Sequence, residues 1–304
     1  MRIPLYIATA INEAYLLPLR VMLASLKAHL NPSHRPVLFL LNAGLGAEQL
    51  RTIAGLVETQ SIVPGVAVTS MLPRSPRYIV ETAFPLLLSD LLPEFVERIL
   101  FLDPDILVLD DVATIWETDV SNIALAAVAD QAIPLCSSPR GVKDWSSFGI
   151  PETAPYFNAG VMLINLTRWR RLNIATLASK YFQRIGGQTN FLHQEALNAV
   201  LWNDWLPLGQ RWNLIASLTG RAYGPYTRFT WDSPGIVHFA GHFKPWRMRI
   251  GGPFAELYNE FLRQSGSEVR FNNSMSDMML SIYDRYLRRY FYSVERFAWN
   301  HRLV

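Results

Sequence analysis

Short runs of apolar residues recur along the first half of this chain, and segments with helical spacing lie between them. The runs at 3–9, 36–41 and 123–129 are apolar at nearly every position, and leucines recur every three or four residues over 15–30. Strands that are apolar on both faces are typical of parallel sheets covered by helices on each side. The alternation therefore predicts an α/β fold whose mainly parallel sheet is flanked by helices.

The remaining elements continue this alternation. Asn12 is the predicted N-cap of the first helix. The segment 131–156 contains four prolines and two glycines, which predicts a long ordered loop of the kind that often binds substrates. The other predicted elements are strands over 66–69, 98–103 and 157–166 and helices over 47–57, 84–92 and 168–185.

Composition excludes several classes of protein. Half of the 304 residues are hydrophobic, so a sizeable core is available, and the net charge of +3 is too small to indicate a nucleic-acid partner. The single cysteine, Cys136, excludes a disulfide framework and favours a reducing compartment. No apolar run has the length of a membrane-spanning helix, and the N-terminus lacks the layout of a signal peptide. We expect a cytoplasmic protein, with peripheral attachment to the inner face of a membrane left open.

Two carboxylates interrupt the apolar run 98–109. Asp103 and Asp105 are two residues apart, so in an extended segment their side chains point the same way. Converging acids at the end of a buried strand repel each other unless a cation neutralises them, and hard oxygen ligands suit Mg²⁺ or Mn²⁺. The alternative is a solvated turn in which the acids only cap the strand. Candidate ligands further along the chain favour the metal.

Those candidates lie in the Gly- and Pro-containing segment 238–246. His238 ends a short apolar strand and offers an imidazole nitrogen to complete the coordination of a metal, while the ammonium group of Lys244 suits phosphate oxygens. Gly160 lies inside a predicted strand, which indicates either close approach of another backbone or a ligand, or a β-bulge. Together the residues predict a site that binds a diphosphate through a metal.

Four blocks of the chain, in this order, resemble the retaining glycosyltransferases of family 8, which have the Rossmann-like fold called GT-A. The chain is similar to bacterial lipopolysaccharide and lipooligosaccharide galactosyl- and glucosyltransferases and, more distantly, to glycogenin. The blocks are 101–105, 157–166 with Trp169, 193–198 and 238–246.

The resemblance implies roles for individual residues. The implied metal ligands, for Mn²⁺ or Mg²⁺, are Asp103, Asp105 and His238. The residues implied for donor binding are Ala8, Asn12, Asp103, Asn158, Ala159, Gly241 and Lys244. The residues implied for catalysis are Gln194, Asp130 and Lys244, with Asn158 and Gln194 facing the transferred sugar and Asp130 near the acceptor.

The resemblance also implies an activity, the transfer of glucose or galactose from a UDP-sugar to a glycan or lipid-linked acceptor with an α-linkage. Gln194 is a neutral amide and a poor nucleophile, so we favour front-side attack with the leaving phosphate taking the acceptor's proton. Removing the Asp105 carboxylate should abolish turnover and leave the fold as stable as before, or more stable, because a repulsive pair is relieved.

The chain departs from the family at three places. Ala10 stands where an acidic residue usually contacts uracil, and Leu86 stands where a basic residue is usual, a charge that Arg74 or Arg77 would have to supply. The block His193-Gln194-Glu195 replaces Asp-Gln-Asp, which bears on the sugar. Two alternatives remain, a pseudo-transferase that binds nucleotide-sugar or glycan without turnover and, more remotely, a phosphatase of the haloacid dehalogenase type.

We predict a GT-A catalytic domain over 1–250 and a C-terminal helical extension over 251–304. Apolar residues recur at helical spacing over 275–298, accompanied by several arginines and aromatic residues. This pattern suits an amphipathic helix on an anionic membrane surface. It equally suits a helix packed on the catalytic domain or on a second copy of the chain in a homodimer.

Overall fold

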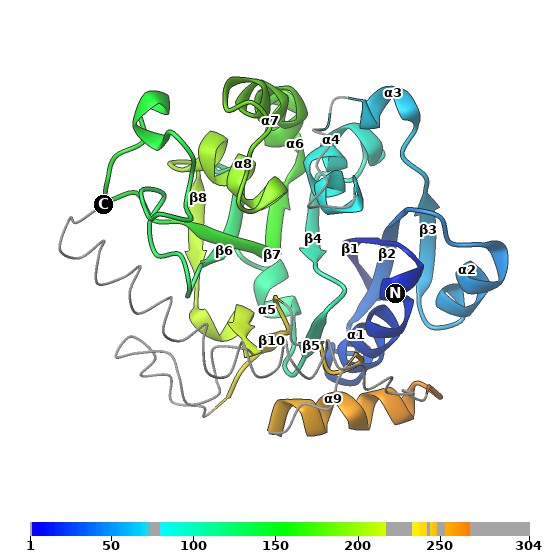
Figure 1. Ribbon diagram of the computed structural model, residues 1–304. Helices are drawn as coiled ribbons and strands as arrows, with labels where there is room; N and C mark the ends of the chain where they lie inside the picture. The colour runs from blue at the N-terminus through cyan, green and yellow to red at the C-terminus, as the bar shows by residue number, and fades with distance from the viewer. Residues whose placement is uncertain are drawn as a thin grey trace.

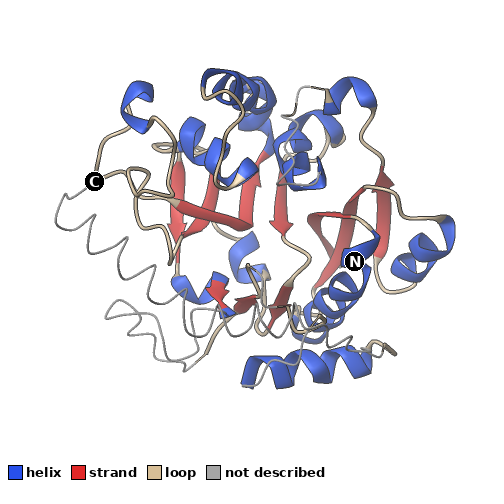
Figure 2. Cartoon of the chain, viewed as in Figure 1, coloured by secondary structure: helices blue, strands red, loops and turns tan. Residues whose placement is uncertain are grey.

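The computed structural model describes residues 2–70, 72, 80–216, 233–241, 244–247 and 253–267. Its centre is a seven-stranded sheet with the strand order β3-β2-β1-β4-β7-β6-β8 (Figures 1 and 2). These strands are β1 (Ile3–Ile11), β2 (His34–Asn42), β3 (Glu58–Ile62), β4 (Arg98–Leu102), β6 (Leu125–Ala129), β7 (Phe157–Asn165) and β8 (Trp205–Leu208).

The sheet is mixed but mainly parallel, as the sequence predicts. Strand β1 is parallel to both β2 and β4, β2 to β3, and β6 to β8, whereas β7 is antiparallel to β4 and β6. Because β7 runs the opposite way, its first residues lie at the same edge of the sheet as the carboxyl ends of β4 and β6. Ligands of open α/β sheets bind at this edge.

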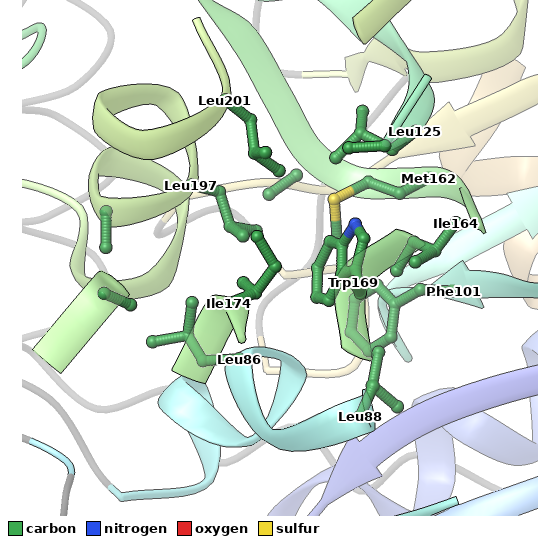
Figure 3. Packing of buried hydrophobic residues seen from close by; sticks show 14 of the residues in the cluster. Leu86, Leu88, Phe101, Leu125, Met162, Ile164, Trp169, Ile174, Leu197 and Leu201 are labelled. Atoms are coloured by element: carbon green, nitrogen blue, oxygen red, sulfur yellow. The ribbon is translucent and has the colours of Figure 1, made fainter. Parts of the chain in front are cut away.

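Helices cover both faces of the sheet. The α-helices of the described residues are α1 (Leu16–His29), α2 (Ala47–Ala54), α3 (Val66–Thr69), α4 (Leu88–Leu91), α5 (Ala113–Trp116), α6 (Leu166–Leu172), α7 (Ile174–Arg184), α8 (Leu192–Leu201) and α9 (Pro253–Gln264). Alternate residues of β4 point to opposite faces: Phe101 packs with α6, α7 and α8, and Leu100 packs with α1 and α5. Trp169, fully buried, is at the centre of the first of these clusters (Figure 3).

A smaller three-stranded sheet adjoins the carboxyl end of β4. It has the order β5-β10-β9, formed by β5 (Ile106–Val108), β10 (Ile236–His238) and β9 (Leu214–Ile215). Helix α9 packs on this sheet and on α1 through a third cluster that contains Val21, Trp246 and Tyr258 (Figure 1). Helix α9, which lies in the predicted C-terminal extension, thus packs on α1 and on the small sheet. Residues 268–304, which include the arginine- and aromatic-rich tail, lie outside the described residues.

Two predicted elements differ in the structure. Residues 66–69 form the short helix α3, and the third strand is instead Glu58–Ile62, whose polar sequence suits a mostly exposed edge strand. The predicted helix over 168–185 is two helices, because Asn173 adopts the left-handed conformation at φ 54° between them. Among the described residues, no helix combines the length and apolar character needed to cross a bilayer.

Candidate active site

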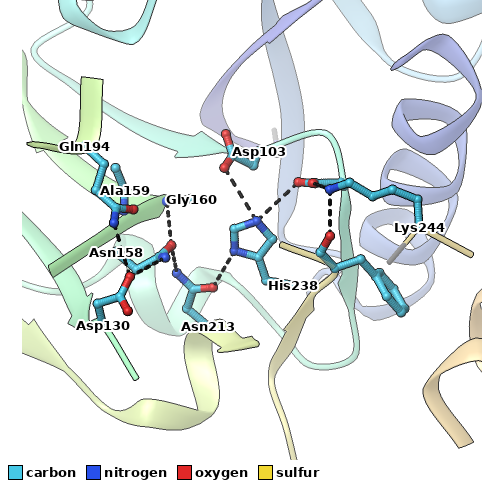
Figure 4. Close-up of polar contacts among 11 residues, drawn as sticks. Asp103, Asp130, Asn158, Ala159, Gly160, Gln194, Asn213, His238 and Lys244 are labelled. Atoms are coloured by element: carbon cyan, nitrogen blue, oxygen red, sulfur yellow. Dashed lines mark hydrogen bonds and ion pairs between the residues drawn. The ribbon is translucent and has the colours of Figure 1, made fainter. Parts of the chain in front are cut away.

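Asp103, Asp105 and His238 converge because two sheets meet at the end of β4. The chain leaves β4 at Leu102, and β5 begins directly after Asp105 and pairs antiparallel with β10, which sets His238 opposite Ile106. The Nε2 atom of His238 lies 3.3 Å from Asp105 Oδ1 and 3.6 Å from Asp103 Oδ2 (Figure 4). One ligand atom from each of the three residues lies within 4.8 Å of the others. The geometry brings together the three metal ligands that the resemblance implies.

Lys244 pairs with one of the two acids of this cluster. Its ammonium group pairs with Asp105 Oδ2 and donates a 2.7 Å hydrogen bond to the carbonyl of Phe239, and only 6% of the residue is exposed. Trp246 lies beside it, with the ammonium 5.4 Å from the ring centroid. The lysine therefore contacts one of the two carboxylates that are candidate metal ligands.

The two carboxylates respond oppositely to this environment. Burial and the neighbouring Asp105 raise the pKa of Asp103 to about 7. Burial also acts to raise the pKa of Asp105, but Lys244 and His238 outweigh it and hold that pKa below its usual range. The pKa of His238 is raised: burial acts to lower it, but the two carboxylates outweigh burial. Asp103 is thus the acid whose charge is not compensated in this arrangement.

Gly160 lies in a β-bulge, one of the two predicted readings, and it is approached closely by side chains and not by another backbone. Strand β7 bulges against β6, since the pairing jumps from Asn158 opposite Val128 to Met162 opposite Ala127. A β-carbon at residue 160 would lie 2.7 Å from His238 Nδ1 and 2.9 Å from Asp103 Oδ2, closer than real contacts allow. Only glycine leaves room for the imidazole here.

A chain of buried polar side chains runs from His238 to α8 (Figure 4). Asn213 contacts His238 Nδ1 at 3.0 Å and donates to Asn158 Oδ1 at 2.8 Å. Asn158 in turn donates to Asp130 Oδ2 at 2.9 Å, and Gln194 donates to the same oxygen at 3.2 Å. The residues implied for the sugar and those implied for the metal therefore form one connected network.

Asp130 anchors the far end of this network. Its other oxygen, Oδ1, accepts the backbone N–H groups of Ala132 and Ile133 at 2.8 and 2.9 Å, so all four of its hydrogen bonds come from the protein. Gln194 is held as firmly, since its Oε1 accepts the N–H of Ala159 at 3.0 Å. That contact leaves Gln194 one further lone pair on its carbonyl oxygen.

The other predicted donor residues lie in different surroundings. Ala8 is fully buried within β1 and its side chain belongs to the core. Asn12 is an N-cap, as predicted, but of the 3-10 turn η1 (Glu13–Tyr15) and not of α1, whose N-cap is Tyr15; its Oδ1 accepts the N–H of Ala14 at 3.0 Å. Gly241 is exposed and has φ 85°, a conformation that favours glycine. Arg74 and Arg77 lie outside the described residues.

The residues on either side of Gln194 face away from the metal cluster. Glu195 is fully buried and accepts hydrogen bonds from the Tyr181 hydroxyl at 2.6 Å and the N–H of Asn190 at 2.7 Å. His193 lies beside the backbone of Thr82 in the 3-10 segment η2 (Val80–Leu87), and burial lowers its pKa to about 4. The block that departs from Asp-Gln-Asp therefore stabilises the fold around Gln194.

Asn213 is the residue that sequence reasoning missed. It ends the 3-10 turn η4 (Gln210–Asn213), and only 1% of it is exposed. The available signal was a polar residue next to an apolar run. Asn213 directly precedes the apolar pair Leu214-Ile215, and Asp103 directly follows an apolar strand.

The residues present fit a divalent cation. Two carboxylates and one imidazole are a donor set for Mn²⁺ or Mg²⁺. The imidazole Nε2 faces the carboxylates, its Nδ1 is held by a second polar side chain as metal-binding histidines usually are, and the space beside them is kept open by Gly160.

A family model describes most of the chain. The model for glycosyl transferase family 8 matches residues 6–249. The chain belongs to glycosyl transferase family 8. Membership leaves no basis for the haloacid dehalogenase alternative.

Relatives of this family 8 protein include bacterial proteins. It is 30% identical over 178 residues to General stress protein A of Bacillus subtilis (strain 168), a match that covers 56% of this chain and 59% of that protein. It is 24% identical over 276 residues to Glycosyltransferase GlyF of Streptococcus pneumoniae serotype 4, covering 88% of this chain and 64% of that protein. The matches thus span less than two thirds of either relative.

The fold is shared with a solved galactosyltransferase. The crystal structure of galactosyltransferase LgtC in complex with donor and acceptor sugar analogs superposes with a TM-score of 0.71 at 24% identity, covering 86% of this chain and 96% of that one. The predicted GT-A architecture is confirmed.

Proposed function

We propose that this family 8 protein transfers glucose or galactose from a UDP-sugar to a hydroxyl of a glycan or lipid-linked acceptor, with retention and in dependence on Mn²⁺ or Mg²⁺. The observation that carries the proposal is the convergence of Asp103, Asp105 and His238 beside a connected chain of amide side chains. A metal cluster alone suits many activities. A metal cluster joined to neutral hydrogen-bonding groups suits a diphosphate that carries a sugar.

Asp103, Asp105 and His238 would hold the cation, which supplies positive charge against the leaving diphosphate. Lys244 lies at the same carboxylate and would contribute its charge to that diphosphate. Asn158 and Gln194 lie along the polar chain and would orient the sugar. Gln194 would stabilise positive charge at the anomeric carbon through its remaining lone pair.

The reaction balances without a protein nucleophile. The bond between the anomeric carbon and the diphosphate oxygen breaks, and the acceptor oxygen bonds to the same face of that carbon. The acceptor's proton passes to the leaving phosphate oxygen. Gln194, as an amide, takes no covalent part.

The test is UDP release from UDP-glucose and UDP-galactose with Mn²⁺ or with excess EDTA, and the anomeric configuration of the product by NMR. We expect release only with metal, an α-product, and loss of both in Asp105→Asn. The matched control is Asp110→Asn. Asp110 is a half-exposed acid that pairs with Arg211 and lies outside the cluster of Asp103, Asp105 and His238. Unchanged release in EDTA, or an inverted product, contradicts the proposal, and binding of UDP-sugar without turnover indicates a pseudo-transferase.

A further inference from the structure

Two backbone N–H groups of the β7 bulge orient the polar chain. Between Asn158 and Met162 the strand leaves its ladder with β6. The N–H of Ala159 donates to Gln194 Oε1 and the N–H of Gly160 donates to Asn158 Oδ1, each at 3.0 Å. Because a backbone N–H only donates, both amide side chains must present their oxygen to the bulge.

The amide orientation that Gly160 imposes on Asn158 also determines the orientation of Asn213, and through it the protonation of His238. With its oxygen toward the bulge, Asn158 also accepts the Nδ2 group of Asn213 at 2.8 Å. Asn213 then presents its own oxygen to His238 Nδ1 at 3.0 Å. An amide oxygen only accepts, so the proton of the neutral imidazole is on Nδ1 and the lone pair is on Nε2, which faces the two carboxylates.

We infer that Asn213 is a positioning residue that holds His238 in the Nδ1–H tautomer with Nε2 as the metal-binding nitrogen, and that joins this ligand to the sugar-side residue Asn158. The inference rests on the proposed function in that it requires a cation at the cluster. Asn213 belongs to none of the four blocks that carry the family resemblance. It is reached only through the geometry of β9 beside β10.

Two substitutions separate the two hydrogen bonds of Asn213. Asn213→Leu removes both, and we expect Mn²⁺ affinity to fall by about 10- to 100-fold, the usual effect of losing a residue that orients a metal ligand. Asn213→Asp keeps an acceptor for His238 Nδ1 but cannot donate to Asn158. It should therefore bind Mn²⁺ more tightly than the leucine variant while its turnover of UDP-sugar stays low.

The matched control is Asn165→Leu. Asn165 is also a buried asparagine, which caps α6 at Arg168 N and donates to the Val120 carbonyl, but it lies at the opposite end of β7 from the cluster. This variant should lose thermal stability and retain wild-type Mn²⁺ affinity. A loss of Mn²⁺ affinity in the Asn213 variants but not in Asn165→Leu is therefore not a general effect of removing a buried amide.

Mn²⁺ affinity is measured on the full chain without nucleotide, from the electron paramagnetic resonance signal of free Mn²⁺. The tautomer is read from ¹⁵N NMR of histidine-labelled protein in Mg²⁺, with His238 assigned by its loss in His238→Gln. We expect the proton on Nδ1. A proton on Nε2 overturns the inference, and so does wild-type Mn²⁺ affinity in Asn213→Leu, or an aspartate variant that binds no better than the leucine variant.

If the leucine variant does not fold, the NMR measurement on the wild-type protein still tests the inferred tautomer of His238. Absence of Mn²⁺ binding in the wild type would instead refute the proposed function. The two failures are therefore distinguishable.

Discussion

Asp103 and Asp105 are two residues apart, yet their charges are balanced differently. Sequence reasoning treats them as a repulsive pair and expects the Asp105 carboxylate to be removed without loss of stability. The structure corrects this for Asp105, because the buried Lys244 ammonium pairs with it across 139 residues of sequence. No local pattern reports that contact. The candidate metal ligands can be named from the sequence, whereas their charge balance follows only from the fold.

This difference predicts opposite effects on stability. Asp105→Ala leaves Lys244 buried without its carboxylate and should lower the free energy of unfolding by about 3 kcal/mol. Asp103→Ala removes the acid whose pKa is raised by burial and by Asp105, so stability should be unchanged or increased. Urea unfolding in EDTA measures both variants. Equal destabilisation of the two would contradict the assignment of Lys244 to Asp105.

Gly160 gives a second prediction for a single residue. In Gly160→Ala the new methyl group meets His238 Nδ1 and Asp103 Oδ2, so we expect at least a tenfold loss of Mn²⁺ affinity, about 1.4 kcal/mol. Gly209→Ala is the control, since nothing lies within 4 Å of a β-carbon there and its φ is −60°. Wild-type Mn²⁺ binding in Gly160→Ala would show that the imidazole has room to move.

At the scale of elements, hydrophobic pattern predicts the buried strands well and the edge strand poorly. The strand that ends at Asp103 and the one that begins at Phe157 are recovered because both are apolar on both faces. Strand β3 is missed because its residues are mostly exposed. The pattern instead predicts a strand over 66–69, where three of the four residues are β-branched and the structure has helix α3. The bulge in β7 is one of two predicted readings of Gly160, and the structure adds a close approach by the side chains of His238 and Asp103.

Helix α8 carries a prediction about pH, because His193 has a pKa of about 4 in the folded protein against an ordinary 6.5. Well above pH 6.5 the imidazole is neutral in both states. As the pH falls through 6.5 toward 4, the unfolded chain binds a proton that the folded protein does not. The free energy of unfolding should fall by roughly 3 kcal/mol over this range from His193 alone.

Chemical denaturation at a series of pH values measures this contribution. His193→Gln should flatten the fall between pH 6.5 and 4. Identical slopes in wild type and His193→Gln would show that the burial of His193 does not affect its protonation.

At the scale of the whole molecule, the site forms where three strand ends and a second small sheet meet. The mainly parallel topology predicts that Asp103 and Asp130 share one edge of the sheet, and the structure joins them through His238, Asn213 and Asn158. The small sheet could not be predicted, because β5, β9 and β10 have only two or three residues each and β5 pairs with β10 across more than a hundred positions. Lys244 and Asn213 owe their places to that sheet.

The central claim is that the cluster of Asp103, Asp105 and His238 binds the diphosphate of a uridine nucleotide through a divalent cation. Isothermal titration of UDP into the full chain, first with Mn²⁺ and then with excess EDTA, tests it most directly. We predict saturable binding with Mn²⁺, at least tenfold weaker binding in EDTA, and the same loss in Asp105→Asn with Mn²⁺ present. Equal affinity for UDP with and without metal would contradict the claim.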